Sequence, residues 1–197
     1  MKQQQRSSVM AAKLVDYIKT YNGLVDEQFC KNVIETFSKS NGEYIDNNQR
    51  PSFTELNISR RFLDKDPNWI DIQNNLTKVF IDAVELYMDD LDSGPDFPEK
   101  YAFEEHRLKM YHPNGYDQFK DHVDVGDYKS ARRFLVCFLY LNTVSEGGET
   151  SFPKLDYQIA PECAKILVFP ATWQWRHAGL PTVSENKYIV GTYLHYV

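Results

Sequence analysis

From about residue 100 onward, the chain consists of short apolar or alternating runs separated by turn residues. Regularly spaced short strands with turns between them are typical of a β-sandwich or barrel. The expected strands cover 103–111, 116–124, 132–142, 149–152, 164–169, 173–178 and 187–196. The second half of the chain therefore predicts a mainly β fold.

The first half contains two stretches with helical spacing of apolar residues. In 26–40, Asp26 can cap a helix with a continuous apolar stripe. The stripe contains Phe29, Val33, Ile34 and Phe37. A second helix begins with Asp66 as its cap and Pro67 at its first position, and its apolar residues keep helical spacing as far as Tyr87.

The other segments of the first half carry weaker patterns. Residues 12–21 alternate enough to predict a strand, and the polar stretch 41–60 predicts loops with one short strand. No linker rich in Pro, Gly or Ser divides the chain, so we expect one domain, 1–197, with a single core. Its helices and lid loops lie in 1–100 and pack on one sheet of the β-rich part, 101–197.

Composition excludes several classes of function. The net charge of -6 argues against nucleic acid or an anionic membrane as the main partner. No run approaches transmembrane length, and the polar start, 1–10, lacks the apolar stretch of a signal peptide. Cys30, Cys137 and Cys163 are scattered and form no CxxC motif, which predicts reduced, mostly buried thiols and a cytoplasmic protein.

Two side chains that can bind a metal stand two residues apart in "KDHVDVGDY". Residues i and i+2 of a strand face the same side, so His122 and Asp124 can be two ligands of one metal site. The candidates for a third ligand are His106, His177 and His195. His112, between Tyr111 and Pro113, is expected in a turn.

His177, in "WQWRHAG", completes a set of two imidazoles and one carboxylate. That facial triad leaves three positions of a metal open and is typical of non-haem Fe(II) oxygenases. The alternative is a chance HxD pair and a structural histidine.

Lys187 begins the apolar C-terminal run "KYIVGTYLHYV". Strand alternation puts it on one face with Ile189, Gly191, Tyr193 and His195. If that face lines a barrel, the buried ammonium needs a carboxylate partner, which a dicarboxylate co-substrate can supply. The alternative is an edge lysine whose ammonium reaches water.

Three strings carry a resemblance to a known family: "RLKMYHPNGYDQFKDHVD", "RFLVCFLYLNTVSEGGETSFP" and "WRHAGLPTVSENKY". Together they resemble the Fe(II)/2-oxoglutarate dioxygenases of the prolyl 4-hydroxylase type. The family order is Tyr, H-x-D, Y-L-N/T, G-G-E-T, a distal His and Lys, and all six elements are present. The resemblance covers 103–197, and "LVDEQFCKNVIETF" is similar to the N-terminal helix of that family. It implies a double-stranded β-helix, or jelly roll, as the catalytic core, with N-terminal helices outside it.

The resemblance also implies roles for particular residues. His122, Asp124 and His177 correspond to the iron ligands, and Lys187 to the cation that holds the distal carboxylate of 2-oxoglutarate. Tyr111 and Thr150 correspond to positions that hydrogen-bond the co-substrate, and Tyr140 corresponds to a residue that assists in related hydroxylases. For Tyr140 a place in the core is an equal alternative, and Gly147 and Gly148 are expected to form a turn.

Near the substrate the correspondence is looser. Arg133 matches an arginine that contacts the substrate peptide in that family. One alternative is that Arg132 has this role, and another is that both arginines are solvated basic residues at the start of a strand. His195 matches a position near the substrate. Tyr193 stands where the family usually has tryptophan, which leaves the shape of the substrate pocket open.

The implied reaction is hydroxylation with Fe(II), 2-oxoglutarate and O2, giving succinate and CO2, with ascorbate as reductant. The implied partner is a peptide or protein that contains proline, with 41–65, 92–102 and 124–131 as candidate lids. The alternatives are hydroxylation of another side chain or a free amino acid, a metal-dependent isomerase or lyase that uses the same ligands, and a jelly-roll module with a structural metal.

Overall fold

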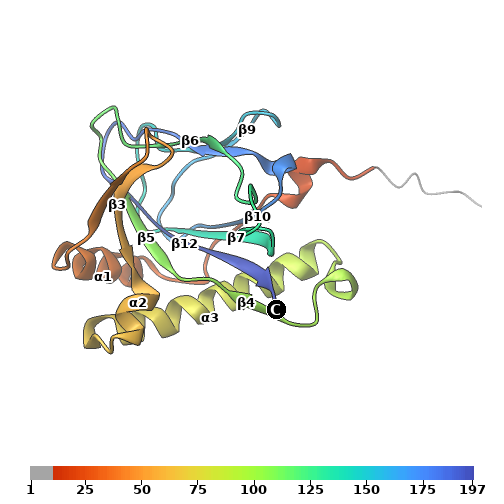
Figure 1. Cartoon of the computed structure of the whole chain (residues 1–197), viewed down its shortest axis with the longest axis horizontal. Coiled ribbons are helices and arrows are strands. Elements are labelled where there is room, and N and C mark those ends of the chain that lie inside the picture. Colours follow the sequence, from red (N-terminus) through yellow and green to blue (C-terminus); the bar gives the residue numbers. More distant parts are fainter. Residues whose placement is uncertain (1–10) are drawn as a thin grey trace, which may run out of the picture.

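The computed structural model describes residues 11–197, in which two antiparallel sheets face each other (Figure 1). In spatial order, the larger sheet contains β1 (Lys19–Tyr21), β10 (Ile166–Pro170), β7 (Arg133–Tyr140), β12 (Lys187–Tyr196), β5 (Arg107–Tyr111), β3 (Ser52–Asn57) and β2 (Glu43–Asp46), with β4 (Tyr101–Phe103) paired to β12. The smaller sheet contains β6 (Phe119–His122), β11 (His177–Gly179), β8 (Thr150–Phe152) and β9 (Tyr157–Ile159). The expected mainly β jelly roll is confirmed.

The helices lie together along the outer side of the larger sheet (Figure 1). They are α1 (Glu27–Ser38), α2 (Ile58–Leu63) and α3 (Pro67–Asp90), and short 3-10 turns form η1 (Leu14–Tyr17), η2 (Gly94–Asp96) and η3 (Trp173–Trp175). Both predicted caps are present, because Asp26 accepts a hydrogen bond from the Phe29 amide at 2.7 Å and Asp66 accepts one from the Asn68 amide at 3.1 Å. The expected packing of the helices against one sheet is also confirmed.

The larger sheet separates two apolar clusters, and β7 contributes to both. Leu135, Cys137 and Leu139 face α1 and α3, while Val136, Phe138 and Tyr140 face the smaller sheet. Burial on both faces explains why this strand is apolar almost throughout its length. One cluster therefore anchors the helices, and the other supports the interior of the jelly roll.

Several local expectations were wrong. Of the expected strand 12–21, only Lys19–Tyr21 forms a strand, β1. Residues 14–17 form a 3-10 turn, because the Asp16 carboxylate accepts a hydrogen bond from the Lys13 amide at 2.7 Å. The polar stretch 41–60 holds two strands and the start of α2. Its strand β3 pairs with β5 and β2, and these distant partners stabilise it despite its mixed sequence. Strand β9 was not expected.

No helix in the described part of the chain is long and apolar enough to cross a bilayer. Cys30, Cys137 and Cys163 are free thiols, and the first two are buried. Residues 1–10, from which we inferred the lack of a signal peptide, lie outside the described residues.

Replacing Leu76 with alanine should destabilise the fold by about 2–5 kcal/mol, because the side chain is fully buried where α3 meets the sheet. Urea unfolding followed by circular dichroism measures the change. Lys78→Ala, an exposed substitution on the same helix, should change the unfolding free energy by less than about 0.5 kcal/mol. Equal effects of the two substitutions would contradict the packing described here.

Candidate active site

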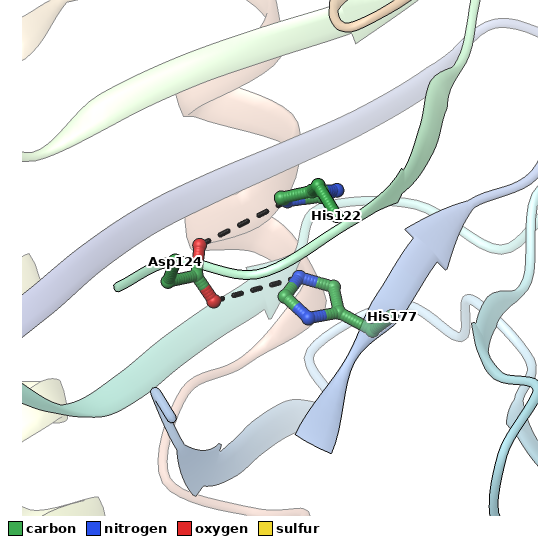
Figure 2. Close-up of side chains that lie close together, drawn as sticks. All are labelled: His122, Asp124 and His177. Carbon is green, nitrogen blue, oxygen red and sulfur yellow. Dashed lines mark ion pairs between the residues drawn. The ribbon is translucent and has the colours of Figure 1, made fainter. Parts of the chain in front are cut away.

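His122, Asp124 and His177 come together at the edge where β6 and β11 pair (Figure 2). His122 ends β6 and is the register partner of His177, the first residue of β11. The Nε2 atoms of His122 and His177 lie 3.8 and 3.7 Å from the two carboxylate oxygens of Asp124. One ligand atom from each of the three residues lies within 4.8 Å of the others. The three residues that the sequence analysis grouped as a candidate metal site therefore lie together.

The route by which Asp124 reaches the site differs from the prediction. The strand ends at His122, so Asp124 is not its i+2 neighbour on a strand but lies in the bend that follows. The polar segment after β6 turns the chain there and brings the carboxylate beneath both imidazoles. Strand alternation therefore paired two residues that do lie together, but Asp124 is not on the strand that this reasoning assumed.

Backbone carbonyls orient both imidazoles for metal binding. The Nδ1 atom of His122 lies 2.9 Å from the Lys120 carbonyl, and that of His177 lies 3.1 Å from the Trp175 carbonyl. A carbonyl can only accept, so each Nδ1 carries the proton and each Nε2 keeps its lone pair free. Burial, assisted by the neighbouring His177, lowers the pKa of His122 to about 3, which keeps this ring in its neutral, metal-binding form.

The Asp124 carboxylate is incompletely satisfied within the described residues. Its Oδ1 accepts a hydrogen bond from the Tyr193 hydroxyl at 2.8 Å, whereas its buried Oδ2 has no partner among residues 11–197. A buried carboxylate oxygen without a partner is costly. A divalent cation between this oxygen and two free imidazole nitrogens would remove that cost. The residues present therefore fit a 2-His-1-carboxylate iron site.

A cavity leads from the two histidines to Lys187. Its lining includes Tyr111 and Thr150. Lys187 is 1% exposed and its Nζ donates to the Gly148 carbonyl at 2.6 Å, so this lysine does not reach water as the alternative required. Burial lowers the pKa of Lys187 to about 7. The cavity thus joins a metal-binding group at one end to a buried amine at the other.

The turn at Gly147 and Gly148 shapes the end of this cavity. Both residues have positive φ values, 78° and 77°, as expected for a glycine turn. A Cβ atom on Gly148 would lie 3.3 Å from Cδ of Lys187, so a larger residue would press on the lysine. Beside the turn, the hydroxyls of Tyr140 and Thr150 hydrogen-bond each other at 2.6 Å.

The residues expected near the substrate form a network behind Asp124. Arg133 makes two 2.8 Å contacts with Glu104, donates to the Asp124 carbonyl at 3.2 Å and lies 4.0 Å from the Tyr193 ring centre. His195 lies 3.7 Å from the same glutamate. Arg133 and Tyr193 also line a groove next to the cavity. The alternative, Arg132, is exposed.

A bulge explains why strand parity favoured Arg132. In the pairing of β12 with β7, Leu194 lies opposite Leu135, but the next residue, His195, lies opposite Arg133. The extra residue of β7 interrupts the alternation at that point. Arg133 consequently turns toward Tyr193.

The other histidines have structural contacts. His106 stacks on Phe80 with ring centres 5.4 Å apart, and its Nδ1 lies 2.6 Å from the side-chain nitrogen of Gln73. His112 contacts Asp117 at 2.8 Å in a turn, as expected. The sequence analysis missed Phe119, which stacks on His122 with ring centres 3.5 Å apart. The spacing gave no signal for this contact, because residues three apart on a regular strand face opposite sides and an irregularity in the pairing of β6 with β11 brings the two rings together.

Comparison with known protein families gives a match over the C-terminal part of the chain. Residues 107–195 match the model of the 2OG-Fe(II) oxygenase superfamily. No curated protein sequence matches the chain.

Several solved structures share the fold. A viral collagen prolyl hydroxylase from Paramecium Bursaria Chlorella virus-1, in its 2OG complex, has a TM-score of 0.69 at 21% identity, over 92% of this chain and 96% of that one. A Trichoplax adhaerens prolyl hydroxylase gives 0.68 at 12% identity, over 91% and 84% of the two chains. A Pseudomonas putida prolyl-4-hydroxylase gives 0.67 at 14% identity, over 92% and 93%. At such identities the structures establish the jelly-roll fold, and the segment that matches the 2OG-Fe(II) oxygenase superfamily, 107–195, contains the triad and Lys187.

Proposed function

We propose that this protein hydroxylates proline in a peptide or protein, with Fe(II), 2-oxoglutarate and O2. The observation that carries the proposal is the triad of His122, Asp124 and His177 at one end of a cavity that Lys187 closes at the other. The similar structures support proline as the target, since all three are named as prolyl hydroxylases and one contains a peptide fragment.

His122, Asp124 and His177 would hold the iron, which, when bound with 2-oxoglutarate and O2, supplies the oxidant that hydroxylates a C–H bond and gives succinate and CO2. The protein contributes geometry and exclusion of water. The carbonyls behind each imidazole hold the proton on Nδ1 and direct both Nε2 atoms at the site. Phe119, stacked on His122, shields that ring from solvent.

In this proposal Lys187 binds the distal carboxylate of 2-oxoglutarate. Its ammonium is held by the Gly148 carbonyl, so it is already directed into the cavity before the carboxylate arrives. Tyr111, whose ring centre lies 5.1 Å from the Lys187 ammonium, and Thr150 supply hydroxyl groups for the same ligand. Tyr140 acts through its bond to Thr150, whose hydroxyl it orients.

The proposal extends to the surroundings of the site. Ascorbate would serve as reductant, and the three free cysteines support a reducing, cytoplasmic location. The helices and the jelly roll would act as one domain, because the helices share an apolar cluster with the larger sheet. The hairpin of β2 and β3 forms a wall of the groove that would receive the peptide.

The first experiment measures succinate formed from 2-oxoglutarate with Fe(II), ascorbate and O2, with and without proline-rich peptides. We expect turnover that rises with peptide, and Asp124→Ala should abolish it because the site loses its carboxylate. Asp127→Ala, an exposed substitution in the same loop, should retain it. Turnover in Asp124→Ala would point to a different ligand set, and its absence in iron-loaded wild type would favour a non-oxygenase metal module.

Lys187→Ala should raise the KM for 2-oxoglutarate by about tenfold to a hundredfold, the worth of a hydrogen bond to a charged group. The pKa of Lys187 is about 7 before 2-oxoglutarate binds, and only the protonated form of the side chain attracts a carboxylate. The wild-type kcat/KM for 2-oxoglutarate should therefore fall about tenfold per pH unit above that pKa. Lys187→Arg, which stays charged, should remove this fall. A flat wild-type profile up to pH ~9 together with an unchanged KM in Lys187→Ala would exclude Lys187 as the carboxylate-binding cation.

Tyr193→Phe should weaken metal binding by about tenfold to a hundredfold, because it removes the hydroxyl that positions the Asp124 carboxylate while keeping the ring beneath Arg133. Titration with Co(II), followed by absorbance, gives the dissociation constant without turnover. Tyr128→Phe, at a fully exposed tyrosine, is the control. An unchanged constant in Tyr193→Phe would show that the hydroxyl has no part in holding the metal.

A further inference from the structure

Lys109 is a buried cation for which the proposed reaction has no role yet. It lies on β5 between Arg107 and Tyr111, and strand alternation directs all three toward the interior of the jelly roll. The side chain is 9% exposed and lines both the co-substrate cavity and the adjacent groove. It makes no hydrogen bond or ion pair with any residue that the structure describes.

The carboxylates of the groove are all engaged by arginines. Glu104 binds Arg133 through two contacts of 2.8 Å, and Arg107 binds both Glu55, at 2.7 Å, and Glu105. Glu55 is the register partner of Lys109 across β3 and β5, yet its carboxylate pairs with Arg107 instead. Among the described residues, Lys109 is left as a buried amine with little water around it and no direct counter-ion.

The ammonium leans toward the groove. Its Nζ lies 5.1 Å from the ring centre of Phe53, a residue that lines the groove and not the cavity, and 6.0 Å from that of Phe119. Aromatic faces attract a cation but do not replace a carboxylate. Burial lowers the pKa of Lys109, which Glu55 and Asp124 raise from a distance, so an added anion nearby would stabilise the charged form.

Resting on the proposed function, we propose that Lys109 binds a carboxylate of the substrate beside the proline that is hydroxylated. The distal carboxylate of 2-oxoglutarate is assigned to Lys187, which lines the cavity but not the groove. Lys109 faces the side from which the peptide enters. The favoured substrate therefore carries its negative charge next to the reacting residue, either on an Asp or Glu side chain or at a chain end.

The test compares peptides that differ in one charge. Blocked peptides with Pro-Glu or Glu-Pro are paired with their Gln counterparts, and a peptide ending in a free proline carboxylate is paired with its amide. We expect wild type to show a KM about tenfold lower for the charged member of a pair, as a charged contact warrants. A preference for the internal Glu identifies an acidic side chain as the source, and one confined to the free chain end identifies the terminus.

Substitutions assign the preference to Lys109. The KM ratio should fall to about 1 in Lys109→Met and reverse in favour of Pro-Lys over Pro-Gln in Lys109→Glu, while Lys109→Arg should keep it. Lys154→Met, at an exposed lysine in a distant turn, should keep the wild-type ratio. Circular dichroism checks the fold, and Lys109→Glu provides the answer if Lys109→Met does not fold.

Equal KM values within every peptide pair in wild type would overturn the inference, as would a preference that persists in folded Lys109→Met. A higher KM for 2-oxoglutarate in Lys109→Met, with the peptide ratio unchanged, would also overturn it and assign Lys109 to the co-substrate. If wild type forms no succinate, the proposed function fails separately. Calorimetric titration of the Mn(II)- and 2-oxoglutarate-loaded protein with the same peptides still decides whether Lys109 selects a carboxylate.

Discussion

The register of β6 against β11 places His177 opposite His122, and the other groups of the site are arranged around that pair. Two short strands far apart in the sequence thereby fix the separation of two imidazoles. Carbonyls two residues before each histidine then fix the tautomers, because the backbone oxygens of Lys120 and Trp175 can only accept a hydrogen bond. Asp124 needs no strand of its own, since the bend after β6 brings its two carboxylate oxygens to 3.8 and 3.7 Å from the Nε2 atoms of the two rings.

The interior of the jelly roll contains more charge than its apolar lining would tolerate without partners. Asp124 is held by Tyr193, and the glutamates of the groove are held by arginines. Lys187 and Lys109 are the cations without a carboxylate partner among the described residues of the two cavities. A buried charge is costly unless it is paired, so unpaired buried charges are found mainly where they bind a ligand. This imbalance is the electrostatic basis for expecting two anionic groups, one from the co-substrate and one from the substrate.

The sequence was a good guide where local chemistry decides the structure. The caps at Asp26 and Asp66 and the alternation of β12 predicted their elements, and the sequence proposed as one site three residues that the structure brings together. It was a poor guide where distant partners decide. Strand β3 depends on its pairing with β5, and Lys109 is recognised as unpaired only after Glu55 is seen to bind Arg107. The bulge that turns Arg133 toward Tyr193 lies in the register of two strands, which no single segment encodes.

Part of the wall of the groove is formed by residues outside the matched family segment, 107–195. Phe53 and Glu55 come from β3, and Glu104 precedes β5, whereas the triad and Lys187 all lie within 107–195. The triad therefore lies wholly within the matched segment, whereas the groove combines that segment with β3 and the residues before β5. A change in the hairpin of β2 and β3 alters which molecule enters without altering the metal ligands. Selectivity in this architecture can diverge independently of reactivity, and transplanting that hairpin between relatives is a direct route to new substrates.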